Sequence, residues 1–348
     1  MSLPVWAETL RIATYNAALD RDGPGLLLRD ILKGKDAQID AVVAVIAETA
    51  PDILLLQKVD YDYGLVALTA LRDRIAELGP RYDYLFALRP NTGWPTGLDM
   101  DGNGKLGEAR DAQSYGRFSG QGGMAILSRY PIRADEARDF TRMLWRDLPG
   151  AQLTLEDGTP LMSEDLASVQ RLSYVGHWVV PVEVNDIRMT LLAFHASPPV
   201  FDGPEDRNGR RNRDELRFWQ MYLDGAFGMP PEGPFVLLGD ANLDPSDGDG
   251  RREAIRALLA DPRLQDPRPM RPLPLTDTRP DHTGDARLDT VNWRTPGPGP
   301  KRVDYVLPDA GLRVLGAGVF WPPEGSAMSN IAEAASRHRL VWVDLQLE

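Results

Sequence analysis

The sequence predicts an α/β fold in which two packed β-sheets are covered by helices on their outer sides. Two observations support this prediction. Early in the chain, apolar runs of strand length alternate with segments of helical spacing, which is typical of β–α units. Further on, strand-like runs follow one another across short turns, which indicates antiparallel pairing as well.

The first half of the chain alternates strands and helices. Residues 10–15 are the first expected strand, and residues 37–50 are apolar at helical spacing and stop before a proline. The next expected elements are a strand at 53–56, a helix at 64–78, and strands at 82–87 and 122–127. Residues 89–120 are polar and rich in Gly and Asp, so we expect an insertion there, and long insertions are often functional. Residues 142–169 are a second irregular stretch.

The second half begins with an expected hairpin at residues 173–194, where two β-rich runs flank an Asn-Asp turn pair. The remaining elements expected are a helix at 207–227, a strand at 235–238, a helix at 249–259, and strands at 303–307, 312–316 and 340–347. Residues 262–280 are rich in proline and are expected to be a surface loop. Because no linker divides the chain, we expect residues 9–348 to form a single domain with an insertion at about 89–120.

The composition is that of a globular chain, since 43% of the 348 residues are hydrophobic and 26% are charged. No apolar run approaches the roughly 18 residues that a membrane span needs. The net charge of -12 disfavours nonspecific binding of nucleic acid, although a local basic groove would still permit it. Because the chain has no cysteine, disulfides and thiolate metal sites are excluded.

The segment VWAE, at residues 5–8, is similar to the end of a signal-peptide cleavage site. We therefore expect a periplasmic or secreted protein whose signal peptide ended near Ala7 and was replaced by the present first three residues. The alternative is an ordinary cytoplasmic N-terminus.

Polar side chains stand at the boundaries of several apolar strands. The set comprises Asn16 after LRIATY, His195 after MTLLAF, Asp240 and Asn242 after FVLLG, Asp304 within RVDYVL, and His338 before LVWVDL. Each residue taken alone is also common as a cap or turn residue. Taken together, polar groups that converge at strand ends are typical of a functional site.

A series of motifs runs through nearly the whole chain. They are TYN at 14–16, LLLQK at 54–58, GGMAILSRYPI at 122–132, FHASP at 194–198, LLGDANLDP at 237–245, RVDYVLP at 302–308 and SRHRLVWVDL at 336–345. In content and order they resemble the endonuclease/exonuclease/phosphatase superfamily, the deoxyribonuclease I-like metal-dependent phosphoesterases. The resemblance implies a four-layer α/β/β/α sandwich of two packed mixed sheets, with the site at one edge of the sheets.

The resemblance also implies roles for single residues. Asn16 would help to hold a divalent cation, and His195 would hydrogen-bond a phosphate oxygen and assist the leaving group. Asp240 would orient or deprotonate the attacking water, with Asn242 fixing the phosphate or the metal. This agrees with the chemistry, because attack on a phosphoester needs an aimed water and donors or cations on the phosphate oxygens.

By the same resemblance, Asp304 would hold His338 in one tautomer and stabilise its charged form, so that the pair supplies proton transfer and an oriented imidazole.

The segment at 205–219 is the main basic concentration, and its arginines are candidates for contact with a substrate phosphate. We select Arg211 among them. The alternative is a solvated helix start whose arginines pair with neighbouring acids.

Two positions depart from the family's pattern. The family has Gln-Glu where this chain has Gln-Lys at Lys58, and Ser-Asp-His where this chain has Ser-Arg-His at Arg337. Both missing carboxylates serve the family's magnesium, which requires hard oxygen ligands. We therefore question Mg²⁺ or Mn²⁺ at the active site. We expect the side chains of Lys58 and Arg337 to bind the phosphate directly. The alternative is that both side chains turn into solvent and a metal still binds through Asn16, Asp240 and Asn242.

The insertion contains DMDGNGKLGEARD at residues 99–111, which matches the first half of a calcium-binding loop. Acidic or amide residues stand at positions one, three and five, a glycine at position six, and an arginine where the closing Glu would be. The expected ligands of Ca²⁺ are Asp99, Asp101, Asn103 and the carbonyl of Lys105, with Glu108 or Asp111 closing the shell. The alternative is a polar loop without an ion.

These observations give two main functional hypotheses. The first is an exported phosphoesterase that hydrolyses a phosphomonoester or phosphodiester with a water activated by Asp and His. The second is a pseudoenzyme of the same fold that binds a phosphate ligand without turnover, which Lys58 and Arg337 would favour. A nuclease is disfavoured by the net charge of -12. The expected partner is a phosphorylated small molecule or nucleotide rather than nucleic acid, and the expected state is a monomer.

Overall fold

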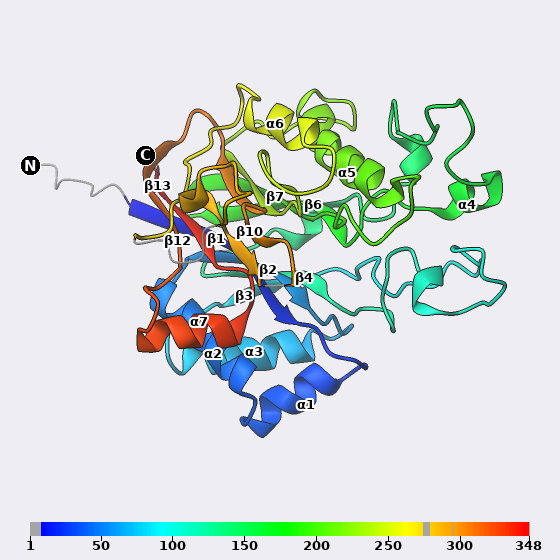
Figure 1. Ribbon diagram of the computed structural model, residues 1–348. Coiled ribbons are helices and arrows are strands. Elements are labelled where there is room, and N and C mark those ends of the chain that lie inside the picture. Colours follow the sequence, from blue (N-terminus) through cyan, green and yellow to red (C-terminus); the bar gives the residue numbers. More distant parts are fainter. Residues whose placement is uncertain (1–7, 274–278, 295, 348) are drawn as a thin grey trace, which may run out of the picture.

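The computed structural model describes residues 8–273, 279–294 and 296–347. Two β-sheets pack face to face, and helices cover both outer sides (Figure 1). The expected end of a signal peptide at residues 1–7 lies outside the described residues, as does part of the proline-rich loop, residues 274–278. In the described ranges, no helix is long and apolar enough to cross a membrane.

The first sheet has six strands in the order β12-β13-β1-β2-β4-β3. Its strands are β1 (Glu8–Leu19), β2 (Ile53–Val59), β3 (Tyr84–Phe86), β4 (Gly123–Ser128), β12 (Arg313–Val319) and β13 (Val341–Leu347). It is a mixed sheet, because β1 pairs parallel with β2 and antiparallel with β13. The helices on its outer face are α1 (Leu26–Lys33), α2 (Ala37–Thr49), α3 (Val66–Ala76) and α7 (Ala327–Ala335).

The second sheet has five strands in the order β11-β8-β7-β6-β5. They are β5 (Arg138–Asp139), β6 (Gly176–Val184), β7 (Ile187–His195), β8 (Phe235–Asp240) and β11 (Asp304–Pro308). Helices α5 (Arg207–Leu223) and α6 (Glu253–Leu259) cover its outer face. The smaller elements are α4 (Glu164–Val169) and the two-stranded pair β9 (Val291–Trp293) and β10 (Gly299–Lys301), with 3₁₀ turns at Ala109–Asp111, Ala134–Glu136, Trp145–Asp147 and Ala286–Leu288.

Alternation along each strand divides the interior into three apolar layers. In β1, Leu10 and Ile12 face the second sheet, whereas Ala13 and Tyr15 face the helices. Both faces of the sheet are therefore buried, which explains why its strands read as continuous apolar runs. The predicted four-layer α/β/β/α sandwich of two mixed sheets is confirmed.

Several elements were not predicted, among them α1, α7, β9 and β10. Helix α7 has the weakly apolar sequence AMSNIAEAA, and it forms because Ser326 caps its first turn and Ala332 and Ala335 pack into the helix-side core. The formation of α7 therefore depends on tertiary packing rather than on a strong local sequence pattern. The helix predicted at 207–227 ends at Leu223.

The insertion predicted at 89–120 is folded against the second irregular stretch, and both extend from one end of the sandwich (Figure 1). The amide of Gln113 donates to the Val169 carbonyl at 2.8 Å. The amide of Asn91 donates to the carbonyls of Thr141 and Ser173, each at 2.7 Å. These buried amides hold two segments that are far apart in sequence in one arrangement.

Candidate active site

The register of the second sheet places three predicted residues in one row. His195 at the end of β7 pairs in register with Asp240 at the end of β8. Asp240 pairs in turn with Asp304 at the start of β11. Adjacent strands lie about 4.8 Å apart, so backbone pairing alone brings an imidazole and two carboxylates together.

The first sheet contributes two more predicted residues to the same edge. The amide nitrogen of Asn16 donates to Asp240 Oδ2 at 2.9 Å. His338, just before β13, places Nδ1 2.9 Å from Asp304 Oδ2, so that nitrogen carries the proton. Ser336 Oγ donates to the Asn16 carbonyl and accepts the His338 N–H, which fixes the two residues relative to each other.

Burial and neighbouring charge set the protonation of these groups. Burial raises the pKa of Asp240 to about 6, and the charge of Asp304 acts in the same direction. Burial opposes the charge of His338, but Asp304 and Asp240 outweigh it and raise the pKa of that imidazole. Near neutral pH, Asp240 is therefore mostly ionised beside a His338 whose charged form is favoured.

His195 differs from His338 because burial dominates its pKa, although a carboxylate lies nearby. Burial lowers the pKa of His195 well below its ordinary value, and the charges of Lys58 and His338 act in the same direction. Its Nε2 lies 3.5 Å from Asp240 Oδ2. Its buried Nδ1 has no hydrogen-bond partner among the described residues. The neutral imidazole therefore retains hydrogen-bonding capacity within the site.

Asn242 holds Asp240 in place. Its backbone N–H donates to Asp240 Oδ1 at 2.8 Å, and its side-chain nitrogen donates to the Ala196 carbonyl at 3.0 Å. It adopts a left-handed backbone conformation with φ 50, which asparagine tolerates better than most residues. The amide nitrogen that was expected to fix a phosphate is thus already engaged.

Lys58 has a left-handed conformation with φ 58, at a point where the pairing of β2 with β4 is irregular. Such a bulge redirects a side chain. Its ammonium lies 3.6 Å from Asp20 Oδ2, and its side chain is 38% exposed. Its charge lowers the pKa of His195 and acts on His338 in the same direction. The cation at the end of the core strand therefore acts on the candidate site.

Arg337 and Arg211, which were both expected to contact a substrate, have different surroundings in the structure. Arg337 is exposed, and its side chain makes no hydrogen bond or ion pair with any described residue. Arg211 is buried and donates to the carbonyls of Leu172 and Ser173 and to Ser114 Oγ. The guanidinium of Arg211 therefore holds the segment before Tyr174, and its contact with a substrate stays a prediction.

The predicted calcium loop closes on itself. The carboxylates of Asp99, Asp101 and Asp111 lie within 4.8 Å of one another. Asp99 accepts the backbone N–H groups of residues 102, 103 and 104, which lower the pKa of its carboxyl. Asn103 Oδ1 accepts the Lys105 N–H at 2.8 Å. The structure thus brings together three of the expected ligands, while the role of the loop stays a prediction.

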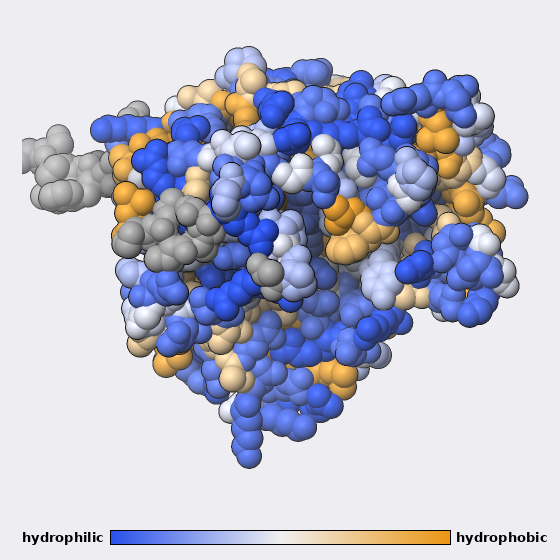
Figure 2. All heavy atoms as spheres, in the orientation of Figure 1, coloured by the Kyte–Doolittle hydropathy of each residue, from blue (hydrophilic) through white to orange (hydrophobic). Residues whose placement is uncertain are grey.

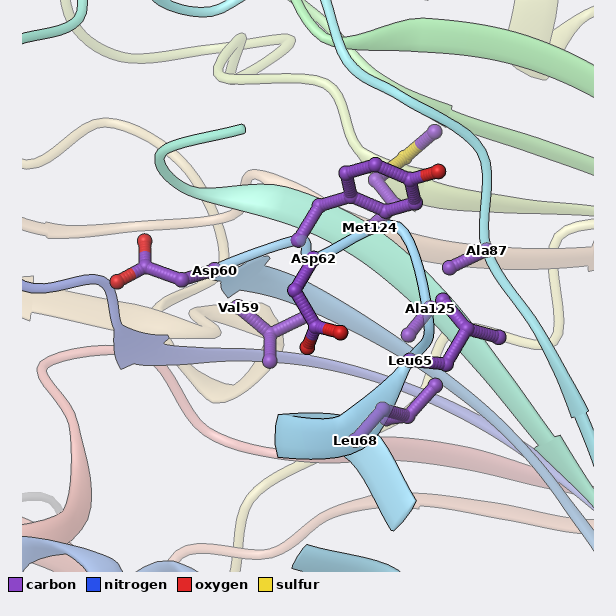
Figure 3. Close-up of a pocket in the computed structure, with 9 residues that line it drawn as sticks. Val59, Asp60, Asp62, Leu65, Leu68, Ala87, Met124 and Ala125 are labelled. Carbon is purple, nitrogen blue, oxygen red and sulfur yellow. The ribbon is translucent and has the colours of Figure 1, made fainter. Parts of the chain in front are cut away.

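A small cavity lies at the end of β2 (Figure 3). Its lining is mostly apolar, including Val59, Leu65, Leu68 and Met124, and its volume of about 10 Å³ is room for one water at most. In Figure 3, the carboxylate of Asp60 points away from the two leucines. This cavity is too small for a substrate. Figure 2 shows a larger hollow near the middle of a mostly hydrophilic face.

Sequence reasoning missed residues that support this edge. Thr290 Oγ1 donates to Asp304 Oδ2 at 2.7 Å and accepts two backbone N–H groups. The ring of Tyr174 meets the His195 ring edge-on, with ring centres 6.1 Å apart. Glu215 accepts the backbone N–H groups of Tyr174 and Ser197, and burial raises its pKa to about 7. Thr290 and Glu215 do not stand at a predicted strand boundary, which was the signal that identified the others, and Tyr174 lies at the start of an expected hairpin but is aromatic.

The fold and this edge define the class of the protein: an α/β/β/α sandwich with an acid–imidazole site where its two sheets meet. The chain belongs to the endonuclease/exonuclease/phosphatase family, because the sequence profile of that family matches residues 13–338. A sequence search of curated proteins gave no significant match.

Solved structures of the family have the same fold. An endonuclease/exonuclease/phosphatase from Beutenbergia cavernae matches with a TM-score of 0.56 and 20% identity, over 97% of this chain and 72% of that chain. A family protein from Leptotrichia buccalis matches with a TM-score of 0.54 and 16% identity, over 97% and 100%. The mannosyl-6-phosphatase Bt3783 from Bacteroides thetaiotaomicron matches with a TM-score of 0.51 and 15% identity, over 97% and 100%.

The residues at this edge do not fit the magnesium ion that the family resemblance implies. The position of the family's principal carboxylate ligand carries the Lys58 ammonium, which repels a dication. The oxygen of Asn16 accepts the Ala18 N–H. Asp240, Asp304 and His338 place ligand atoms within 4.8 Å of one another, but Asp304 is engaged with His338 and a threonine hydroxyl.

The coupling of Asp304 to His338 can be tested directly. Asp304→Asn removes the charge that favours imidazolium, so the pKa of His338 should fall. Two-dimensional NMR titration of the histidine side chains measures this shift. His177, whose pKa burial lowers to about 4, serves as the internal control and should not move. An unchanged or raised pKa of His338 in the variant would contradict the assigned pairing.

Proposed function

We propose that the protein is a phosphoesterase that hydrolyses a phosphomonoester or phosphodiester with a water activated by Asp240. Membership of the family supports a phosphoesterase-type function. The observation that carries the proposal is the environment of Asp240. Its buried carboxylate has a pKa of about 6 and lies between the neutral His195 and a His338 whose charged form is favoured. A base with a pKa near the working pH is efficient in proton transfer.

The proposed reaction uses groups that belong to this chain. Asp240 takes a proton from water as the oxygen attacks phosphorus, while Asn16 and Asn242 hold its carboxylate. His195 donates a hydrogen bond to a phosphate oxygen. The bond from phosphorus to the leaving oxygen breaks, and that oxygen takes a proton from the imidazolium of His338.

Lys58 takes the part that the family gives to its metal. Its fixed ammonium neutralises the phosphate directly and repels a dication from the same position. A metal-bound hydroxide is not formed there, so the proposed reaction relies on Asp240 as the base. Arg337 is exposed, and in this proposal it meets the phosphate only after substrate binds.

The second candidate function is a pseudoenzyme that binds a phosphate ligand without turnover. The observation that favours it is the charge reversal at Lys58, which removes the Lewis acid used by the family. Both candidates use the same phosphate position, so they differ in turnover and not in ligand chemistry.

We also propose that residues 9–348 act as one domain, because no linker divides the chain, and that the protein is a monomer. Its proposed location is outside the cytoplasm, on the basis of the VWAE segment and the absence of cysteine. Fractionation of the producing cells tests the location. Recovery of the native protein in the cytoplasm alone would contradict export.

The catalytic proposal is tested with phosphomonoester and phosphodiester substrates of generic structure. Asp240→Asn and His338→Ala should each lower kcat by at least about 10²-fold, the usual scale for a lost acid or base. Asp73→Asn, an exposed change of the same kind, should leave kcat unchanged. Activity near that of the unmodified protein in either site variant would place the chemistry elsewhere. Phosphate binding without any turnover in the unmodified protein would favour the pseudoenzyme.

The role of Lys58 gives a separate prediction. Metal-depleted protein supplied with Ca²⁺ alone should be as active as protein supplied with Ca²⁺ and Mg²⁺. Lys58→Glu combined with Arg337→Asp restores the family's carboxylates and should make activity depend on Mg²⁺. Lys58→Gln, which removes the cation without adding a ligand, is the matched control and should lower activity with either supplement. Strict Mg²⁺ dependence of the unmodified protein would overturn this role.

We propose further that the loop at residues 99–111 binds one Ca²⁺ ion and orders the insertion. Calorimetric titration of chelator-treated protein should show one site in the micromolar to millimolar range that is typical of such loops. Asp99→Asn with Asp101→Asn should remove the binding heat, whereas Asp135→Asn, an exposed change elsewhere, should not. Absence of binding at millimolar Ca²⁺ would rule the site out.

A further inference from the structure

Three arginines surround one tryptophan of the insertion. The guanidinium carbons of Arg89, Arg142 and Arg171 lie 3.8, 4.8 and 4.2 Å from the centre of the Trp94 ring. We call these four residues the arginine–tryptophan cluster. The arginines come from three separate segments of the chain, so tertiary structure alone brings them together.

None of the three guanidinium groups of this cluster forms an ion pair with a described carboxylate. Arg89 and Arg171 donate to the neutral groups Ser119 Oγ and Asn91 Oδ1. Burial lowers the pKa of Arg171, and the charges of the other two arginines act in the same direction, while the charge of Asp139 opposes them in part.

Such an arrangement is costly without a ligand. All three guanidinium carbons lie within 4.8 Å of one ring centre, so they repel one another inside the roughly 10 Å over which salt screens charge. Stacking on the indole recovers part of this cost and holds the planar groups in fixed orientations. A dianion would compensate the remaining repulsion among the three guanidinium groups, because these groups bind phosphate oxygens through paired hydrogen bonds.

Backbone hydrogen bonds tie the cluster to the imidazole side of the candidate active site. The Trp94 N–H donates to the Asn91 carbonyl, and the Asn91 N–H donates to the Val175 carbonyl, each at 3.0 Å. The Val175 N–H donates in turn to the His195 carbonyl at 3.4 Å. Arg171 also lies three residues before the tyrosine that meets the His195 ring, and three residues span at most about 11 Å.

The loop that contains Trp94 is also hydrogen-bonded to the residues that follow β2. The Gly120 N–H donates to the Thr92 carbonyl at 3.3 Å, and the Tyr61 N–H donates to the Gly120 carbonyl at 2.8 Å. Tyr61 is three residues beyond Lys58. The cluster is therefore anchored to both strands that carry the proposed phosphate-binding groups.

We propose that the arginine–tryptophan cluster binds a second phosphate group of a small substrate that carries two phosphates. This inference rests on the proposed function, since the first phosphate is the one that Lys58 and His195 bind. The cluster determines specificity, because a substrate with one phosphate would leave its charges unpaired. The net charge of -12 repels long polyanions, so a compact bisphosphate fits the molecule better than a nucleic acid strand.

The test uses non-hydrolysable ligands, so that binding is measured without turnover. Alkane-α,ω-diphosphonates with two to eight methylene groups are compared by calorimetry with alkylphosphonates of equal length. The best diphosphonate should bind at least about tenfold more tightly than its monophosphonate, which is the scale of one charge-assisted hydrogen bond. In Arg89→Gln/Arg142→Gln/Arg171→Gln that advantage should disappear, while monophosphonate binding remains.

The control is Arg29→Gln/Arg188→Gln/Arg287→Gln, which changes the net charge equally at exposed ion pairs and should keep the advantage. Among the described residues, the Arg142 side chain contacts the indole and makes no hydrogen bond, so Arg142→Gln alone breaks no hydrogen bond of the structure. This variant should still bind the diphosphonate several-fold more weakly than the unmodified protein. Circular dichroism confirms that each variant is folded.

The outcomes separate this inference from the proposed function. Equal binding of both ligand types, or an advantage that survives in the triple variant, overturns the inference and leaves the catalytic phosphate site intact. Failure of both ligand types to bind at millimolar concentration overturns both. Binding of anionic lipid vesicles or of an oligonucleotide that depends on the same arginines, without a diphosphonate advantage, would assign the cluster to a macromolecule instead.

Discussion

Two carboxylates buried side by side are the constraint on which the site depends. Asp240 and Asp304 are fully buried and paired across β8 and β11. Two like charges in the interior are tolerated only where cations and hydrogen-bond donors compensate them. His338 meets Asp304, while Asn16 and the backbone of Asn242 meet Asp240. The residues that would bind and activate a substrate are therefore the same residues that make this pair of acids possible in the folded chain.

The backbone at this edge is held in unusual conformations for a related reason. Ala18, Lys58 and Asn242 have left-handed conformations with φ 50, 58 and 50, and none of them is glycine. The pairing of β2 shifts on both sides near Lys58. Strain of this kind persists where the surrounding structure over-determines it, and it is concentrated at functional sites. The sheets thus hold the backbone of Lys58 in a conformation that sets the direction in which its side chain leaves the strand.

The sequence predicted most strands of the two large sheets and the strand-end positions of several candidate site residues, because both depend on strands that are buried on two faces. Such strands are visible as apolar runs, and the polar residues at their ends, such as His195 and Asp240, could be selected by position. Helix α7 was missed because its apolar face is made mostly of alanine. The burial of Arg211 could not be predicted, because it depends on contacts with a distant segment of the chain. The arginine–tryptophan cluster could not be predicted, since no local pattern connects its three segments.

The distribution of charge in the protein favours a ligand that is small as well as negatively charged. The chain as a whole has a net charge of -12, whereas the candidate site and the arginine–tryptophan cluster contain Lys58, a His338 with its charged form favoured and three arginines. Salt screens charge over roughly 8–10 Å, so a small dianion bound there is influenced mainly by the nearby cations. A long polyanion also extends into the field of the whole chain, whose net charge is -12. In our proposal, local attraction and general repulsion together favour a compact phosphorylated ligand over a long polyanion.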